Sequence, residues 1–355
     1  MPALATPPQH ICILRLSAIG DICHTLPIVR TIQSKWPETK ITWIIGKTEY
    51  ELLKGIENIH FIIFDKNRGL REYLSICSQL RNTEFDVLLH MQMSLRASLI
   101  SLMVKSKTKI GFDRKRAKDG QWLFTNKKIN YVPRQHVMDS LFGFSESLGI
   151  KDHLNAWNIP ISRADANSAK KLLGNISNYF IISPCSSKSY RNWNIQGYAA
   201  ISDYIKSQYG YDVILTGGNS RIENEYGEKI VQAATSKPIN LIGKTSLKEL
   251  LSIIEGAKCM ISPDSGPAHM ATAMGTPVIG LYATTNPDRA RPYLSASMVV
   301  NRYPDAIYRK YNKHVDEVAW GTRVRDGWAM YLITIDDVKK MVDNFLAKSS
   351  DGKNL

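Results

Sequence analysis

The chain has 355 residues, which is too long for one ordinary hydrophobic core and fits two domains of roughly 150 to 200 residues each. Its composition, 44% hydrophobic and 22% charged, is typical of a soluble globular protein and excludes a disordered or fibrous chain. The formal net charge of +14 favours a polyanionic partner, which is nucleic acid, an anionic membrane surface or a phosphorylated substrate.

The sequence predicts a cytoplasmic protein. Its first ten residues do not resemble a signal peptide, because no basic region is followed by an apolar one. The most apolar long window is interrupted by His90, Gln92 and Arg96, so no transmembrane helix is expected. The cysteines form no C-x-x-C pair, which favours buried free thiols over disulfides or a zinc site: Cys12, Cys23, Cys77, Cys185 and Cys259.

Strand and helix patterns alternate along the first half of the chain. An apolar run at residues 11–16 ends in the tight loop Ser17–Asp21, and a helical pattern follows through Trp36. Further strands are predicted at residues 41–45, 61–64 and 85–90, then an apolar helical stretch at 95–104 and a basic loop at 105–118. This alternation predicts a parallel sheet with helices on both faces.

The second half repeats the alternation, with strands predicted at residues 179–183, 212–216, 239–241, 259–262 and 277–281. Pro160 and the polar residues after it mark a boundary, so the predicted domains are residues 1–160 and 161–335. A last helix near Asp336–Lys348 is expected, and residues 336–355 are predicted to pack back on the N-terminal domain. The fold class is therefore α/β, with two doubly wound Rossmann-like domains facing across a cleft that binds the ligands.

The strongest motif follows the strand at residues 259–262. Asp264 ends it, the small residues Ser265 and Gly266 let the backbone approach a ligand, and a helix begins directly afterwards. Unpaired N–H groups and the helix dipole favour an anion there, and His269 lies one turn into the helix. The motif predicts a diphosphate-binding site, and the alternative is an ordinary helix start with a packed histidine.

A second loop follows the first strand of the same predicted domain. Ser186, Ser187, Lys188 and Arg191 supply hydroxyls and cations, which suit phosphate oxygens and the charge on a leaving diphosphate. A solvated polar loop is the alternative for this segment taken alone. Its pairing with the Asp264 loop on one sheet favours the phosphate interpretation.

Two acidic residues after strand ends have two interpretations each. Glu223, just past Gly217 and Gly218, is expected either to accept ribose hydroxyls or to begin a helix. Asp21 is expected either to act as a general base toward an acceptor hydroxyl or to cap a helix. The chain contains no Asp-x-Asp pair, so no catalytic divalent metal is expected.

Three segments, residues 15–27, 191–193 and 262–269, resemble the ADP-heptose:lipopolysaccharide heptosyltransferases, which have the GT-B fold. The resemblance covers nearly the whole chain and is greatest to the type I enzymes, especially forms that act on a single phosphorylated Kdo. It implies an inverting transfer of L-glycero-D-manno-heptose from ADP-heptose to Kdo of Kdo-lipid A, without a metal or other cofactor. It also implies peripheral attachment to the cytoplasmic face of the inner membrane.

The resemblance also assigns roles residue by residue. It implies that Asp21 is the general base, that Thr245 lies where the backbone meets adenine, and that the donor phosphates contact Ser186, Ser187, Arg191, Asp264, Ser265, Gly266 and His269. This chain has Arg191 and Asn194 where the family more often has Lys and Pro, so Lys188 competes for the leaving-group contact. Glu223 aligns only loosely with the family's ribose contact.

The basic segment is expected to serve the acceptor. We hypothesise that Arg114, Lys115 and Arg116 hold the Kdo-lipid A end and dock the protein on the anionic membrane surface, and a solvated surface is the alternative. The competing functions are a heptosyltransferase for a later core heptose, a non-enzymatic nucleotide-sugar binder and a polyanion-binding protein. Nucleic acid is disfavoured, because the basic residues lack interleaved aromatic platforms and no nucleic-acid-binding motif is present.

Overall fold

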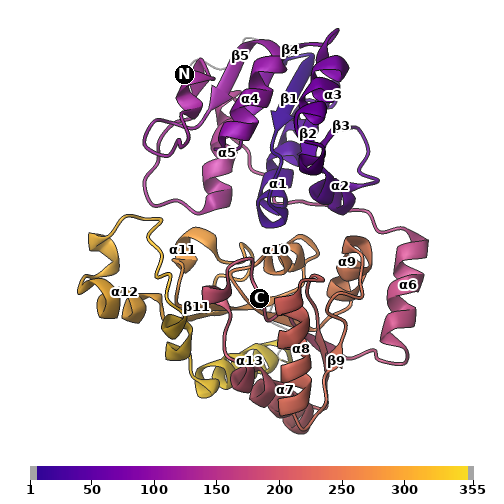
Figure 1. Cartoon of the computed structure of the whole chain (residues 1–355), viewed down its shortest axis with the longest axis vertical. Helices are drawn as coiled ribbons and strands as arrows, with labels where there is room; N and C mark the ends of the chain where they lie inside the picture. The colour runs from indigo at the N-terminus through magenta and orange to yellow at the C-terminus, as the bar shows by residue number, and fades with distance from the viewer. Residues whose placement is uncertain (1–5, 351–355) are drawn as a thin grey trace. The chain divides into compact units, whose positions relative to one another are not determined.

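The computed structural model describes residues 6–350, with side chains through Lys348. Within this range the chain forms two compact units that divide between Pro160 and Ile161. Each unit contains a six-stranded parallel sheet flanked by helices (Figure 1). The predicted α/β class with two Rossmann-like sheets is confirmed.

The N-terminal sheet has the strand order β3-β2-β1-β4-β5-β6, which is the doubly wound order of dinucleotide-binding folds. Its strands are β1 (His10–Leu14), β2 (Lys40–Gly46), β3 (His60–Phe64), β4 (Glu84–His90), β5 (Lys105–Gly111) and β6 (Lys127–Lys128). Its helices are α1 (Ile19–Lys35), α2 (Lys47–Leu53), α3 (Leu70–Leu80), α4 (Leu95–Met103) and α5 (Val137–Ser147).

The C-terminal sheet has the order β12-β11-β10-β7-β8-β9, which is the same winding. Its strands are β7 (Tyr179–Ile182), β8 (Asp212–Leu215), β9 (Ile239–Asn240), β10 (Cys259–Pro263), β11 (Val278–Tyr282) and β12 (Val299–Asn301). Its helices are α6 (Arg163–Leu173), α7 (Ile195–Tyr209), α8 (Arg221–Ala233), α9 (Leu247–Glu255), α10 (Gly266–Ala273), α11 (Pro287–Ala290), α12 (Tyr303–Tyr311) and α13 (Ile335–Ser350). None of the helices in the described range is long and apolar enough to cross a membrane.

The prediction of a basic loop at residues 105–118 is wrong for its first half, which forms β5 and pairs with β4. Cations alternate with small polar residues along β5, so the segment lacks the apolar alternation that marks a half-buried strand. Two of its lysines are anchored to the protein. The Lys105 ammonium donates to the carbonyl of Arg81 at 2.7 Å, and that of Lys109 donates to the carbonyl of Ser101 at 2.7 Å.

The last helix, α13, belongs to the C-terminal unit. Val338, Val342 and Phe345 lie on one face of α13 and are buried in the core of the C-terminal unit. The Phe345 ring contacts that of Phe180 on β7, with 6.1 Å between centroids. The helix therefore buries its apolar face against the sheet that precedes it in the chain.

The prediction of buried free thiols is confirmed for four of the five cysteines, while Cys77 on α3 is exposed. Burial raises the pKa of the Cys23, Cys185 and Cys259 thiols to about 12. These side chains are therefore neutral packing groups at physiological pH.

Trp193 anchors the loop that carries Arg191. Its indole is fully buried, and the indole N–H donates to the carbonyl of Ile333 at 3.0 Å. Gly197 on α7 lies against this ring so closely that a Cβ there would come within 2.5 Å of it. Position 197 must therefore be glycine for the indole to keep its place.

We expect Gly197→Ala to lower the free energy of unfolding by about 1–3 kcal/mol, because the added methyl overpacks the core. The direction of the change in unfolding free energy tests the packing argument, since Gly→Ala inside a helix otherwise stabilises by about 0.5–1 kcal/mol. Urea unfolding measures the change. The control is Gly327→Ala, where an added Cβ would meet nothing within 4 Å. Equal effects of the two substitutions would contradict the packing argument.

Candidate functional site

The loops after β7 and β10 lie at the same edge of the C-terminal sheet, because these two strands are paired and parallel. They bring four predicted residues together. The Ser186 hydroxyl donates to the carbonyl of Asp264 at 2.8 Å, and the Arg191 guanidinium reaches that carbonyl at 3.2 Å and the Asp264 carboxylate at 3.1 Å. His269 Nε2 lies 4.0 Å from the other oxygen of this carboxylate.

The start of α10 lies beside this cluster. Ser265 is the N-cap residue but does not cap the helix with its side chain, and its hydroxyl instead bonds that of Ser262 at 2.7 Å. The N–H groups of the first turn therefore have no side-chain cap, and the helix dipole is directed at the same place. Gly266 adds no side chain at this point. The arrangement suits a bound anion.

Burial strengthens the electrostatic interactions of the cluster. The side chains of Arg191, Asp264 and His269 are only 12%, 11% and 7% exposed. The Asp264 carboxylate fixes the Arg191 guanidinium through one of its NH₂ groups, while Arg191 Nε is buried without a hydrogen-bond partner among the described residues. Buried donors are rarely left without a partner, so this atom is a candidate for a ligand oxygen.

The other predicted residues of this loop lie differently. Ser187 and Lys188 are exposed, and Arg191, not Lys188, is the cation at Asp264. Asn192 was not predicted, although its side-chain oxygen accepts the backbone N–H of Ser186 at 2.8 Å and so fixes the loop. The sequence offered one signal for Asn192, which is that a polar residue lies between Arg191 and Trp193.

The loops after β8 and β9 also lie together. The N–H of Gly243 donates to the carbonyl of Gly217 at 3.1 Å, and Gly243 has a positive φ of 73°. A Cβ at Gly243 would lie 2.8 Å from the side-chain oxygen of Asn219. The half-buried Thr245 follows in the same loop. Backbone groups are thus presented at this edge of the sheet, where Thr245 was predicted to meet adenine.

Glu223 is engaged by the start of α8. One carboxylate oxygen accepts the N–H of Gly218 at 2.8 Å, and the other accepts the hydroxyl of Ser220 at 2.6 Å. The Ser220 hydroxyl in turn caps the N–H of Glu223 at 3.3 Å. This geometry matches the helix-start interpretation of Glu223 and does not favour a ribose contact.

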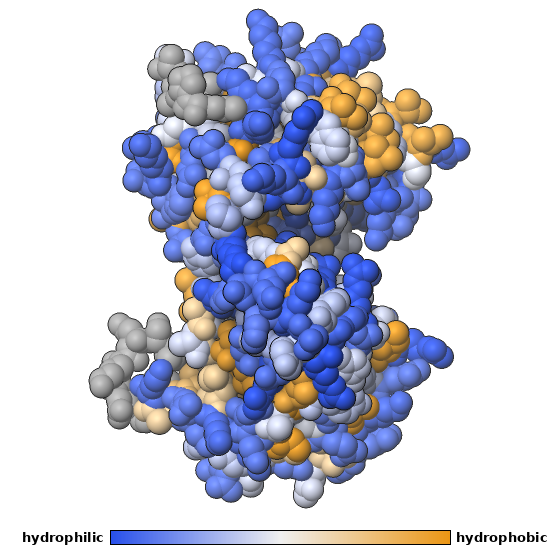
Figure 2. Space-filling model, turned by 90° about the vertical axis from the view of Figure 1, so that its left-hand side faces the viewer, coloured by the Kyte–Doolittle hydropathy of each residue, from blue (hydrophilic) through white to orange (hydrophobic). Residues whose placement is uncertain are grey.

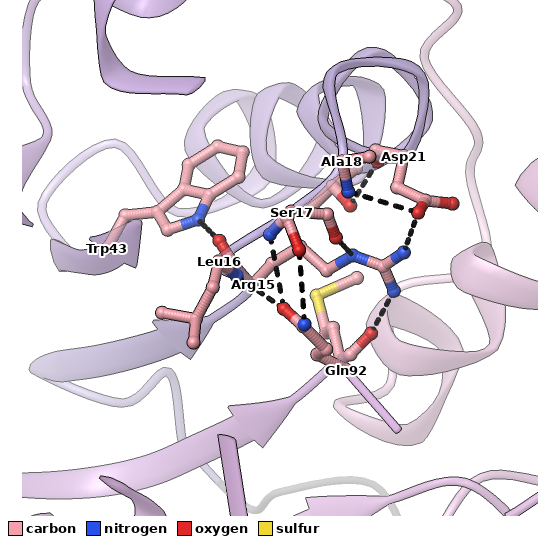
Figure 3. A network of polar contacts seen from close by, with 9 residues as sticks. Arg15, Leu16, Ser17, Ala18, Asp21, Trp43 and Gln92 are labelled. Atoms are coloured by element: carbon pink, nitrogen blue, oxygen red, sulfur yellow. Dashed lines mark hydrogen bonds and ion pairs between the residues drawn. The ribbon is translucent and has the colours of Figure 1, made fainter. Parts of the chain in front are cut away.

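In the N-terminal unit, Asp21 lies in the first turn of α1 and its side chain is 37% exposed. One carboxylate oxygen, Oδ2, makes an ion pair with Arg15 at 2.6 Å and accepts the N–H of Ala18 at 3.2 Å (Figure 3). The second oxygen is turned away from the guanidinium in Figure 3. Asp21 therefore supports the helix start and still presents a carboxylate oxygen outward.

The loop that carries Asp21 is fixed by Arg15, which is 8% exposed. Its Nε donates to the carbonyl of Ser17 at 3.0 Å, and its guanidinium also donates to the carbonyl of Met91. Because Arg15 holds both the loop and the carboxylate, it orients Asp21. The sequence signal was available, since Arg15 is the only charged residue in the apolar run at residues 11–16.

Two glutamines that follow β4 in the chain, Gln92 and Gln121, support the same loop. The side-chain oxygen of Gln92 accepts the N–H groups of Leu16 and Ser17 at 2.6 and 3.2 Å (Figure 3). The fully buried Gln121 donates to the carbonyls of His90 and Gln92 at 2.8 and 3.2 Å. Neither glutamine was predicted to serve the site.

The basic residues after β5 do not act as one group. Arg116 is 18% exposed and pairs with Asp113, and its guanidinium also donates to the Ser140 hydroxyl and the Asn130 carbonyl, both at 2.6 Å. Arg116 therefore ties the turn to α5, and its internal partners do not favour the predicted contact with a ligand. Arg114 and Lys115 are exposed.

Known proteins resemble this chain along most of its length. A profile of glycosyltransferase family 9 (heptosyltransferase) matches residues 73–318. Lipopolysaccharide core heptosyltransferase OpsX of Haemophilus influenzae is 42% identical to this chain, covering 95% of it and 97% of the relative. Lipopolysaccharide heptosyltransferase 3 of Escherichia coli K12 is 26% identical, covering 77% of this chain and 82% of the relative.

Lipopolysaccharide heptosyltransferase 1 of Escherichia coli K12 is 21% identical, covering 82% of this chain and 93% of the relative. Among solved structures, a glycosyl transferase family 9 protein from Veillonella parvula superposes with a TM-score of 0.82 at 20% identity, covering 98% of this chain and 100% of that one. This last similarity supports the fold.

Proposed function

Because this chain belongs to glycosyltransferase family 9, the heptosyltransferases, we propose that it transfers L-glycero-D-manno-heptose from ADP-heptose to Kdo of Kdo-lipid A. The convergence of Ser186, Arg191, Asp264 and His269 beside the start of α10 carries the proposal, because it forms an anion site suited to a diphosphate. The 42% identity to a lipopolysaccharide core heptosyltransferase supports lipopolysaccharide core biosynthesis as the pathway.

In this proposal the C-terminal unit binds the donor. When the bond between the sugar C1 and the phosphate oxygen breaks, negative charge develops on the leaving ADP. The Arg191 guanidinium and the first turn of α10 stabilise that charge, and His269 lies beside them. Asp264 holds the guanidinium in position, while the exposed Ser187 and Lys188 border the same loop.

In the N-terminal unit, Asp21 takes the proton from the acceptor hydroxyl whose oxygen forms the new bond to C1. Arg15 binds Oδ2 and keeps the carboxylate oriented, so the outward oxygen is the one that receives the proton. Attack opposite the leaving diphosphate inverts the configuration at C1. ADP leaves with the electron pair of the broken bond.

Measuring nucleotide release tests the donor assignment. The purified protein is expected to release ADP from ADP-heptose, and to leave UDP- and GDP-sugars unchanged. EDTA is expected to have little effect, because Arg191 and the start of α10 supply the positive charge for the leaving group. Activity that collapses with EDTA and returns with magnesium would contradict the metal-free mechanism.

A later heptose of the core is the second candidate for the step. It is favoured by one observation: the relatives named heptosyltransferase 3 are 26% and 24% identical, whereas those named heptosyltransferase 1 are 21% or 22% identical. Identity alone therefore gives the type I assignment no advantage over later steps. The acceptor that the enzyme uses decides between them.

We place the acceptor contact at Arg114 and Lys115, the exposed cations after β5. Replacing both with serine is expected to raise the acceptor KM about 10-fold or more, since each cation contributes about 1 kcal/mol near an anionic surface. The ADP-heptose KM should stay unchanged. The control is the double change Lys170→Ser and Lys171→Ser on α6, which removes two exposed cations elsewhere. An unchanged acceptor KM would reduce Arg114 and Lys115 to solvated surface.

A further inference from the structure

Two neighbouring helices of the N-terminal unit expose leucines. On α3, Leu70 and Leu74 are 83% and 72% exposed, and on α4, Leu95, Leu99 and Leu102 are 56%, 41% and 62% exposed. The two helices contact each other, so these five residues form what we call the leucine patch. Figure 2 shows apolar side chains gathered on the surface of the upper unit.

The leucine patch is separate from the core that the same helices build. Ile76 and Leu80 of α3, and Ala97 and Ile100 of α4, are buried in the N-terminal core. The exposed leucines of α4 recur at the i, i+4 and i+7 positions, which is one face of a helix. Each helix therefore has a second apolar face that the unit does not cover, and a large exposed apolar patch marks an interaction surface.

Cations outnumber acids around the leucine patch. Across residues 66–81 and 94–107, all of which the structure describes, the only acid is Glu72, which is 3% exposed and pairs with Arg68 at 3.0 Å. The exposed cations in these two segments are Lys66, Arg68, Arg71, Arg81, Arg96, Lys105 and Lys107. The exposed Glu84 on β4 is the register partner of Lys105, and the rim is still predominantly basic. An apolar surface with a predominantly basic rim complements anionic headgroups above acyl chains. Two copies of it would repel each other.

We propose that the leucine patch docks the protein on an anionic phospholipid bilayer, with the leucines among the acyl chains and the arginines at the headgroups. The choice of a bilayer rests on the proposed function, because an acceptor with acyl chains resides in a membrane. The leucine patch does not include Arg114 and Lys115, which we assign to the acceptor itself. Arg71 and Arg96 are the cations closest in sequence to the exposed leucines.

Vesicle co-sedimentation of the full chain tests the docking, with phosphatidylcholine vesicles that contain or lack phosphatidylglycerol. Serine at all five leucine positions is expected to lower the partition coefficient by at least about 30-fold, because buried apolar area drives interfacial binding. The double change Arg71→Gln and Arg96→Gln should lower the partition coefficient about fivefold per cation. This effect is expected only with vesicles that contain phosphatidylglycerol.

Matched controls change exposed residues outside the patch. Leu154→Ser and Leu294→Ser replace leucines that are 42% and 52% exposed, and Arg221→Gln replaces an arginine on α8 whose side chain is 89% exposed. These variants should bind vesicles as the wild type does. Circular dichroism and thermal unfolding of the five-leucine variant show whether it is folded, and the Arg71 and Arg96 variant tests the surface independently.

Binding by the five-leucine variant at the wild-type level would overturn the proposal. The proposal would also be overturned if the wild type is a dimer, the five-leucine variant is a monomer, and both bind vesicles equally. The leucine patch would then be an interface between copies of the chain. Heptosyl transfer to a deacylated, water-soluble acceptor should be the same for wild type and variant. If wild type transfers heptose to no acceptor but binds anionic vesicles through the leucine patch, the proposed function fails and the docking surface stands.

Discussion

Replacing Asp21 with alanine is expected to lower turnover by about 100-fold or more, which is the range for loss of a positioned general base. The affinity for ADP should stay nearly unchanged, since the donor contacts assigned above come from the C-terminal unit. The physical reason is the outward carboxylate oxygen of Asp21, which Arg15 orients but does not occupy. Initial rates of ADP release and calorimetric titration with ADP measure the two quantities.

Asp21→Asn separates the chemical role from the structural one. An asparagine oxygen can still accept the N–H of Ala18, so the start of α1 is kept while the base is lost. The control is Asp65→Asn, because Asp65 also caps a helical turn and pairs with a cation, Lys47, at 3.0 Å. Turnover near the wild-type value in Asp21→Ala would remove Asp21 from the mechanism.

Replacing Arg191 with alanine is expected to weaken ADP binding and to lower turnover by about 100-fold or more, as for loss of a preorganised charge donor in a buried site. The substitution also leaves Asp264 buried without its cation, which places an uncompensated negative charge beside the diphosphate. Both changes act against the same anion. Steady-state kinetics and ADP titration of the variant measure the two effects.

Lys188→Ala is the matched comparison for Arg191, because Lys188 belongs to the same loop but is exposed. We expect a small effect on both turnover and ADP affinity. A larger loss in Lys188→Ala than in Arg191→Ala would exchange the roles of the two cations. Arg191→Lys should recover only part of the activity, since an ammonium cannot offer two donors in the fixed geometry of a guanidinium.

The sequence predicted most strands of both sheets, because apolar runs between helical patterns leave few alternatives for a parallel sheet. It failed at β5, where lysines alternate with Ser106 and Thr108, so the outer strand has the composition of a solvated loop. The periodicity of Val338, Val342 and Phe345 shows that a face is buried, but not which sheet covers it.

The cluster around Asp264 was predictable because the pairing of β7 with β10 brings the ends of these strands together. The support of Asp21 was not predictable, since it joins residues far apart in the chain, such as Leu16 and Gln92, which differ by 76 positions. For Arg116, the sequence pattern and the structure indicate different roles. Its place in a basic run indicates a surface, whereas its side chain is bound to Asp113 and Ser140.

Mass spectrometry of the acceptor after incubation with ADP-heptose tests the central proposal most directly. The acceptors are Kdo-lipid A with and without a phosphate on Kdo, and a core that already carries its first heptose. We predict one heptosyl residue added to Kdo, preferentially to the phosphorylated form, with one ADP released for each transfer. Addition to the heptosylated core alone, with both Kdo-lipid A acceptors left unchanged, would contradict the assignment to the first heptose.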